Sequence, residues 1–344
     1  MAANITYHEQ TDIDNIRKLR EVLKTLPAFA KDYFRAIEPT TSTKTRISYA
    51  YDIRIFFQFL ISQNPSLAKI GIPNLNVSVL DQLKPIDIEE YMEYLKLYDS
   101  PNDQTTITNG ERGLKRKISS LRSFYTYYYK RQAIETNPVQ LVDMPKIHDK
   151  AIIRLDAGET AALLDYIEHC GDQLTGQRKA YYEKTKLRDL AIVTLLLGTG
   201  IRVSECVGLD VEDIDFRNNG IRLIRKGGSE MVVYFGPEVE KALKDYLESR
   251  KAISPLEGHE HALFYSTQRK RIGVQAVENL VKKYARAITT TKKITPHKLR
   301  STYGTTLYQE TGDIYLVADV LGHKDVNTTK KHYAAMDDAR RRKA

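Results

Sequence analysis

The sequence has few cysteines and no long apolar run. Its two cysteines, Cys170 and Cys206, cannot form a disulfide framework, and neither belongs to a CxxC pair that would indicate zinc. The longest strongly apolar run, residues 190–197, is interrupted by Thr194 and falls far short of the about 20 residues that span a bilayer. The N-terminus lacks the basic start and apolar core of a signal peptide. These absences favour a soluble protein of a reducing, intracellular compartment.

What the chain does have is length, apolar content and positive charge. Its 344 residues suit two domains, and a hydrophobic content of 42% can bury a sizeable core. The formal net charge is +9. This balance favours a polyanionic partner such as nucleic acid, with a solvated basic surface as the alternative.

The first half of the sequence predicts helices separated by polar loops. Apolar residues recur at helical spacing near the N-terminus, namely at Leu19, Val22, Leu23 and Leu26. Further helices are predicted from about residue 42 to a break at 64–66, from about residue 85, and from 111 to about 132. Residues 66–82 and 98–110 read as loops.

The second half contains the only clear β signal. Apolar side chains alternate or cluster within residues 221–225 and 231–235. A Lys-Gly-Gly-Ser turn lies between these two segments, which predicts a β-hairpin. Asp156 and Glu159 are spaced to cap a helix over 156–166. Buried helices are predicted at 186–198 and 203–208. The fold class expected is therefore mainly α with a small antiparallel β-sheet.

Several residues are candidates for chemistry, although each is weak alone. Arg202 opens a helix after a Gly-Thr-Gly-Ile turn, at the end where the helix dipole favours anions. An arginine, a helix N-terminus and small neighbours together suit a phosphate, whereas a surface arginine is the plain alternative. His297 and Arg300 are three residues apart after Pro296, which suits the first turn of a helix, so both side chains would share a face of that helix. An ordinary cationic helix start is the alternative for this pair.

Three other candidates carry little information alone. His323 follows Gly322 as if at a helix end, where histidines are more often structural. Lys226 lies at the tip of the predicted hairpin, where most lysines are only solvated. Tyr333 is one of 22 tyrosines.

The combination is far more specific than its parts. The chain shows, in order, TGIRVSE at 199–205, KGG at 226–228, TPHKLRST at 295–302, LGH at 321–323 and NTTKKHY at 327–333. This order resembles the catalytic set of the tyrosine recombinase or phage integrase family. Residues 115–125 and 134–138 resemble the last helices of that family's core-binding domain, and residues 45–54 resemble its first long helix. The resemblance covers about residues 28 to 340.

The resemblance implies a two-domain, C-shaped DNA clamp. We expect an N-terminal helical extension at 1–27, a helical, SAM-like core-binding domain at 28–142, a linker at 143–154 and a catalytic domain at 155–344 with a C-terminal nucleophile segment. Proline and mixed charges within 143–150 independently suggest the linker. The 27 leading residues are too few for a separate arm-binding domain, which favours a Cre- or Xer-like enzyme.

The resemblance also implies a mechanism. Arg202 and Arg300 would hold the non-bridging oxygens of a DNA phosphate, because guanidinium forks match phosphate geometry. His323 would add a hydrogen bond, and Tyr333 would attack to form a 3′-phosphotyrosine. His297 is the expected general base and Lys226 the expected general acid.

Glu205 is expected to orient the active-site cations. The covalent link conserves the bond energy, so no ATP is needed. No compact cluster of carboxylates, cysteines or histidines occurs at metal-ligand spacing, so we expect no metal and no other cofactor.

The chain departs from the family pattern at a few positions. Nine residues separate His323 from Tyr333 where eight are usual, and His332 occupies the usual place of the nucleophile. Arg225 stands where a glycine usually precedes the hairpin lysine. Ser229 and Met231 replace later basic residues of the hairpin, and Ser301 replaces a common histidine.

The expected partner is double-stranded DNA with inverted-repeat sites. Six basic residues are candidates for phosphate contacts, with a solvated helix face as the alternative: Lys44, Arg46, Lys115, Arg116, Lys117 and Arg122. We expect a monomer in free solution and a homotetramer on two sites, because the eleven residues after Tyr333 carry little apolar surface. The stripe at 19–26 is a second candidate for protomer contacts, with packing inside its own domain as the alternative.

The function expected is site-specific recombination. Integration or excision of a mobile element is the alternative, and a type IB topoisomerase-like enzyme or an inactive DNA-binding protein fits less well. An inactive protein would be expected to lack Arg202, Arg300 or Tyr333, and all three are present. We expect the protein in the cytoplasm, associated with the nucleoid and encoded by a bacterium or a mobile element.

Overall fold

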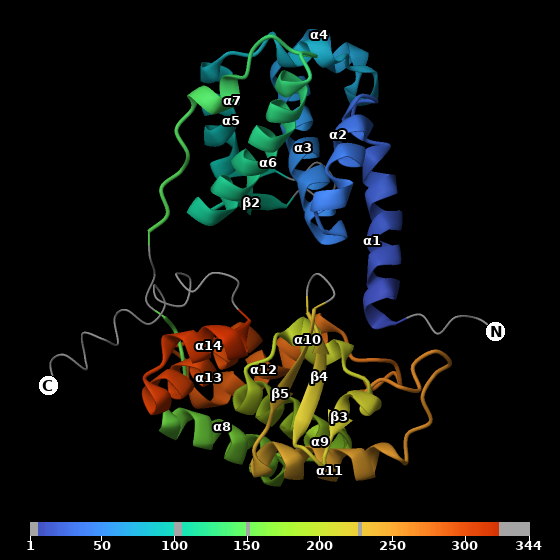
Figure 1. Ribbon diagram of the computed structural model, residues 1–344, viewed down its shortest axis with the longest axis vertical. Helices are drawn as coiled ribbons and strands as arrows, with labels where there is room; N and C mark the ends of the chain where they lie inside the picture. The colour runs from blue at the N-terminus through green and yellow to red at the C-terminus, as the bar shows by residue number, and fades with distance from the viewer. Residues whose placement is uncertain (1–5, 100–104, 149–151, 226–228, 323–344) are drawn as a thin grey trace, which may run out of the picture. The chain divides into compact units, whose positions relative to one another are not determined.

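The chain folds into two compact units, residues 1–150 and 151–344, as a computed structural model shows (Figure 1). The structure describes residues 6–99, 105–148, 152–225 and 229–322. The division falls within the segment that the sequence suggested as a linker. Each unit is described by itself.

Unit 1, residues 1–150, is a helical bundle. Its helices are α1 (Tyr7–Leu23), α2 (Ala30–Ala36), α3 (Thr43–Gln63), α4 (Pro65–Ile70), α5 (Pro85–Lys96), α6 (Glu111–Lys130) and α7 (Pro138–Leu141). Short 3-10 turns occupy Glu38–Thr40, Ile72–Asn74 and Val77–Leu80. The bundle closes around large aromatic side chains of α3, α5 and α6, including Phe56, Tyr91 and Phe124, each of them buried. Burial of such rings is the main stabilising contribution in this unit.

The apolar stripe of α1 is used inside unit 1. Leu19, Val22 and Leu26 are buried in the same core as α3 and α6, and Leu23 packs against it. Of the two roles considered for this stripe, packing within its own domain is therefore the one observed. It offers no free apolar face for contacts between protomers.

Two segments predicted as loops contain regular structure. Asn64 begins α4 instead of only ending α3, since its side chain accepts hydrogen bonds from the N–H groups of Ser66 and Leu67 at 2.9 and 3.3 Å. Strands β1 (Leu97–Asp99) and β2 (Thr106–Thr108) form a small antiparallel pair within the second segment. Three-residue strands with mostly exposed side chains carry no hydrophobic alternation, so the sequence could not show them.

Unit 2, residues 151–344, combines helices with a three-stranded antiparallel sheet. Its elements are α8 (Ala157–His169), α9 (Gly176–Thr199), α10 (Val203–Gly208), β3 (Ile214–Asp215), β4 (Gly220–Ile224), β5 (Glu230–Tyr234), α11 (Pro237–Arg250), α12 (Val274–Ile288), α13 (Pro296–Thr311) and α14 (Ile314–Leu321). The strand order is β3-β4-β5, and Ile224 pairs with Glu230 at the turn end of the hairpin. The expected cap of α8 is present, because Asp156 accepts from the N–H of Glu159 at 2.8 Å.

Helix α9 forms the centre of unit 2 and packs against α8, α11 and α13. It begins at Gly176, earlier than predicted, because its first half is polar and lacks an apolar period. Ala191, Ile192, Leu195 and Leu196 are fully buried in its second half. The expected fold class, mainly α with small antiparallel sheets, is confirmed. No helix of the described ranges is both long and apolar enough to cross a membrane.

Candidate active site

A tight turn between α9 and α10 places Arg202. Gly200 ends α9 in the left-handed conformation with φ +62°, and Arg202 then becomes the N-cap residue of α10. The N–H of Arg202 donates to Glu205 Oε2 at 2.7 Å, and its Nη1 donates to Glu205 Oε1 at 2.8 Å. About two fifths of the Arg202 side chain (40%) stays exposed, so the guanidinium remains accessible to an anion.

Arg300 lies in the interior of unit 2. It is on the second turn of α13 and is only 4% exposed. Its guanidinium donates to the carbonyl of Gly200 at the end of α9 and to the carbonyl of Leu321 at the end of α14. One side chain of α13 therefore bonds to the ends of both α14, the next helix in the chain, and α9, about 100 residues earlier.

The carbonyl end of α14 is where the arginines meet. Its last carbonyls have no partner inside the helix, and positive charge at this end is favourable. Arg225 Nη2 donates to Val320 O at 2.8 Å, Arg300 to Leu321 O, and Arg202 Nη2 to Gly322 O at 3.1 Å. Three consecutive carbonyls thus accept hydrogen bonds from three guanidinium groups. These groups come from the hairpin, from α13 and from the N-terminus of α10.

Glu205 compensates part of this positive charge. It is buried, with Oε1 2.8 Å from Arg202 Nη1 and 4.0 Å from Arg225 Nε. Burial lowers the pKa of the Arg225 guanidinium, Glu205 raises it and Arg202 lowers it further. An arginine stays protonated under such shifts, so the cluster keeps its charge. Glu205 thus bonds to both the backbone and the side chain of Arg202.

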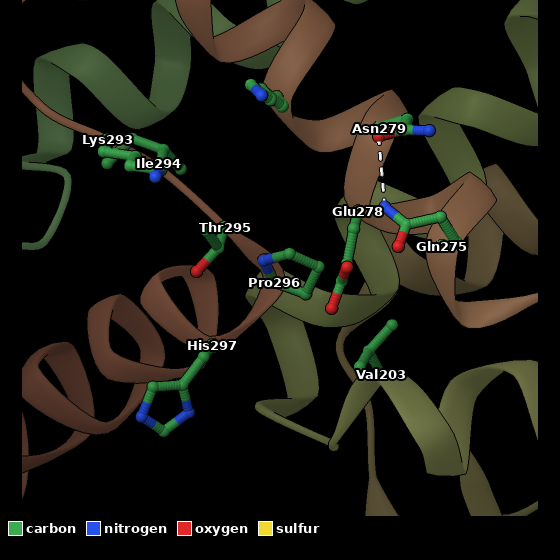
Figure 2. Close-up of a pocket in the computed structure, with 10 residues that line it drawn as sticks. Val203, Gln275, Glu278, Asn279, Lys293, Ile294, Thr295, Pro296 and His297 are labelled. Carbon is green, nitrogen blue, oxygen red and sulfur yellow. Dashed lines mark hydrogen bonds between the residues drawn. The ribbon is translucent and has the colours of Figure 1, made fainter. Parts of the chain in front are cut away.

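His297 has a different environment from Arg300. It is exposed on the first turn of α13 and lines a pocket of about 310 Å³ together with Val203, Glu278 and Lys293 (Figure 2). Val203 directly follows Arg202, so this pocket reaches the N-terminus of α10.

Three of the predicted site residues, Lys226, His323 and Tyr333, lie outside the described residues. The described chain ends at Gly322, whose carbonyl bonds to Arg202. Arg225 was not predicted as a site residue and differs from the family's hairpin motif. The structure places it with Arg202 and Arg300 at the end of α14. The only feature of the sequence that could have indicated this role is that Arg225 stands where the family usually has a glycine. Within the described part of the chain, no three His, Cys, Asp or Glu side chains gather in a way that could hold a metal ion.

Four of the six predicted DNA-contact residues keep exposed surface, namely Lys44, Lys115, Arg116 and Arg122. Lys44 is exposed on α3, and Lys115 is half-buried on α6. Both Nη atoms of Arg116 donate to the buried carboxylate of Asp52, yet 47% of the Arg116 side chain remains exposed. Lys117 points at the same carboxylate, at 3.4 Å, and is nearly buried; burial lowers its pKa, which Asp52 opposes. Lys117 is therefore better explained as a structural partner of Asp52 than as a DNA contact.

Two further arginines of the predicted set are also used within unit 1. Arg46 is buried and pairs with Glu38 at 2.8 Å. Arg122 donates to the carbonyls of Val139 and Val142 at 3.0 Å, which holds α6 to α7. Their position in the sequence resembles that of exposed helix cations, but tertiary contacts occupy them. We therefore revise the DNA-contact prediction to Lys44, Lys115 and Arg116.

Replacing Gly200 with alanine should destabilise unit 2 and disturb the site. A left-handed φ costs an L-residue about 1–2 kcal/mol, and a Cβ at Gly200 would also lie 2.3 Å from Cδ1 of Tyr303. We expect a total loss of roughly 2–5 kcal/mol, since overpacking adds about 1–3 kcal/mol. Gly176, at the other end of α9, has φ +56° and nothing within 4 Å of its Cβ position, so G176A reports the strain alone. Equal denaturation midpoints for G200A and G176A would contradict this prediction.

Comparison with known proteins decides the family. A sequence model of the phage integrase family matches residues 154–340, more than half of the chain. The chain belongs to this family. The recombinase is 33% identical over 337 residues to tyrosine recombinase XerC of Caldanaerobacter subterraneus subsp. tengcongensis, which covers 94% of this chain and 87% of the relative. It is 29% identical over 344 residues to tyrosine recombinase XerS of Streptococcus equi subsp. zooepidemicus, which covers 94% and 96%.

Solved structures show the same fold. The XerH site-specific recombinase bound to palindromic difH substrate, a post-cleavage complex, gives a TM-score of 0.63 at 18% identity over 85% of this chain and 77% of XerH. The Tn1549 transposon integrase in complex with transposon right end DNA gives 0.62 at 21% identity over 91% and 98%. The prediction of a tyrosine recombinase, and of an enzyme of that class, is confirmed.

Proposed function

We propose that this recombinase cleaves and rejoins DNA at specific sites through a 3′-phosphotyrosine at Tyr333 and exchanges strands between two sites. The observation that carries the proposal is the convergence of Arg202 and Arg300 on the end of α14. Phosphodiester cleavage builds negative charge on the phosphate, and preorganised cations stabilise that charge. In the sequence, His323 follows this point directly and Tyr333 comes ten residues after His323.

Each residue has a chemical task in this proposal. Arg202 and Arg300 bind the non-bridging oxygens, with Arg202 the more accessible of the two. His297 accepts the phenolic proton of Tyr333, which has an ordinary pKa near 10 and needs such help. Lys226 donates a proton to the departing 5′-oxygen. His323 adds a hydrogen bond to the phosphate, and Glu205 holds Arg202 in place.

The reaction needs no external energy in this scheme. The P–O5′ bond breaks as the P–Oη bond of Tyr333 forms, so the phosphotyrosine keeps the energy of the phosphodiester for rejoining. The 5′-hydroxyl of another strand then attacks and releases the tyrosine. No metal or nucleotide takes part in any of these steps.

A nicked duplex tests the chemistry directly. The protein first selects its site from a random-sequence duplex library, and a nick is then placed just downstream of the cleaved phosphate. The short 5′-hydroxyl fragment dissociates after cleavage, so the protein stays attached to the upstream strand. We expect attachment in EDTA as in magnesium, with the adduct mapping to Tyr333. Attachment to the downstream strand, or a requirement for magnesium, would contradict the proposal.

The same site separates recombination from simple relaxation. A supercoiled plasmid with two copies of the site should yield products in which the segment between them is inverted or excised. Relaxed plasmid without such products would instead indicate the topoisomerase-like alternative. The same assay can compare two identical sites with a pair of different sites, one from a mobile element and one from its target. Preferred recombination of the different pair would indicate integration of a mobile element.

We further propose that the protein is a monomer alone, binds inverted-repeat sites as two cooperating copies, and pairs two such sites as a tetramer. The structurally similar XerH recombinase is bound to a palindromic substrate, and a palindrome suits two copies on one site. The stripe of α1 is buried within unit 1, so it does not hold free protomers together. Light scattering should give one chain alone and two chains per single duplex site. A stable tetramer without DNA, or one chain per full site at saturation, would contradict this assembly.

A further inference from the structure

Arg225 joins the turn end of the β4–β5 hairpin to α14. Its N–H donates to Ser229 O at 2.8 Å, which continues the strand pairing beyond Ile224. Its side chain leaves the hairpin, with Nη2 2.8 Å from Val320 O and Nη1 3.5 Å from Asp319 O. Only 13% of this side chain is exposed. The residue that follows β4 thus makes a long-range contact to a helix end, about 95 residues further along the chain.

The fit against α14 is close. Gly322 is left-handed with φ +59°, and a Cβ there would lie 1.5 Å from Arg225 Nη1. The guanidinium therefore lies directly against the backbone of Gly322, and only a glycine leaves room for it. Arg225 Nε is buried without a hydrogen-bond partner among the described residues, and Glu205 Oε1, at 4.0 Å, is its nearest carboxylate oxygen.

We propose that Arg225 is a positioning residue for strand cleavage, which fastens the turn end of the hairpin to the carbonyl end of α14 beside Arg202. The inference rests on the proposed function and extends it to a residue that does not touch the phosphate. In the sequence, Lys226 follows Arg225 and His323 follows Gly322. The contact therefore links the two chain segments that lead to the proposed acid and to the phosphate-binding histidine. An arginine suits this role because its fork reaches two carbonyls and its charge is favoured at a helix C-terminus.

The test compares two leaving groups. In the ordinary substrate the departing 5′-oxygen takes up a proton, whereas a substrate with sulfur at the 5′-bridging position releases a thiolate that needs none. General acids contribute about 10²–10⁴-fold to rate, so we expect K226A to lose that factor with oxygen and to recover with sulfur. We expect R225Q to slow the oxygen substrate about 10–100-fold and to cleave the sulfur substrate within a few fold of wild type.

Two variants accompany this comparison. R225K keeps the positive charge but lacks the planar guanidinium. Its cleavage rate on the oxygen substrate should therefore fall less than that of R225Q, and the sulfur substrate should restore it equally. R222Q is the matched control, because Arg222 lies on the same hairpin, is 57% exposed and pairs with Asp213 at 3.1 Å. It should match wild type with both substrates. If thermal melting shows that R225Q is unfolded, R225K takes its place in the test. The quantity compared is again the ratio of the cleavage rates on the oxygen and sulfur substrates.

The outcomes separate this inference from the proposed function. Equal slowing of both substrates by the Arg225 variants, or no slowing of either, overturns the positioning role. Failure of sulfur to rescue K226A removes the acid role from Lys226, whereas rescue of R225Q in the same experiment still supports Arg225. Absence of any adduct at Tyr333 in the wild-type protein overturns the proposed chemistry itself.

Discussion

Replacing Tyr333 with phenylalanine should abolish covalent attachment to a nicked site while leaving DNA binding close to that of the wild type. Phenylalanine keeps the ring but removes the oxygen that forms the phosphotyrosine, and no other group in the proposed site can replace it. Tyr333 is also the only tyrosine after His323 in the sequence. Denaturing gel electrophoresis of the labelled upstream strand measures the adduct, and gel shift measures binding.

Tyr315→Phe is the matched control for this experiment. Tyr315 is the tyrosine that precedes Tyr333 in the sequence, and 62% of it is exposed on α14. Its variant should form the adduct at the wild-type rate. A labelled adduct on Y333F that survives denaturation, or its loss in Y315F instead, would reject the assignment of the nucleophile.

Replacing Arg300 with lysine should reduce the cleavage rate about 10²–10³-fold, as loss of one preorganised donor to a developing oxyanion does in other enzymes. Lysine keeps the charge but cannot donate to the carbonyls of Gly200 and Leu321 together. Stability should also fall by about 1.5–3 kcal/mol, because one buried carbonyl loses a charged donor. Single-turnover cleavage and urea denaturation measure the two effects separately.

Arg188→Lys shows how much of the R300K effect comes from stability alone. Arg188 is also an interior arginine of unit 2, with its side chain 11% exposed, and it donates to Tyr265 O and to Asp189. It lies outside the arginine cluster. R188K should lose stability by a similar amount and still cleave at close to the wild-type rate once folded. Equal cleavage rates for R188K and R300K would show that Arg300 is only structural.

Most helices could be predicted from local sequence. Helices α3, α5, α6 and α10 begin where a capping residue, a proline or an apolar period marks them, and these signals act over a few residues. The small strands β1 and β2 and the polar first half of α9 were missed, because nothing in their local pattern differs from a loop. The motif order that indicates the family was also readable without a structure.

The environment of each cation was not readable from the sequence. Lys115, Arg116 and Lys117 are adjacent in one basic run, yet Lys117 is buried against Asp52 while its neighbours keep exposed surface. The difference arises because a helix turns each residue by about 100°, and the partner helix that supplies Asp52 is 65 residues away. Charge alone therefore does not separate exposed cations from cations that pair inside the fold.

By itself, the sequence determined the fold class and the family and supplied the residues that we propose carry the chemistry, since periodicity, capping and motif order can be read without a structure. Only the tertiary structure decided that Arg202, Arg225 and Arg300 share the end of α14, because these contacts join residues about 20 to 120 positions apart. A helix end has unpaired carbonyls wherever it lies, but which side chains reach them depends on packing. That packing makes Arg225, a departure from the pattern, part of the site.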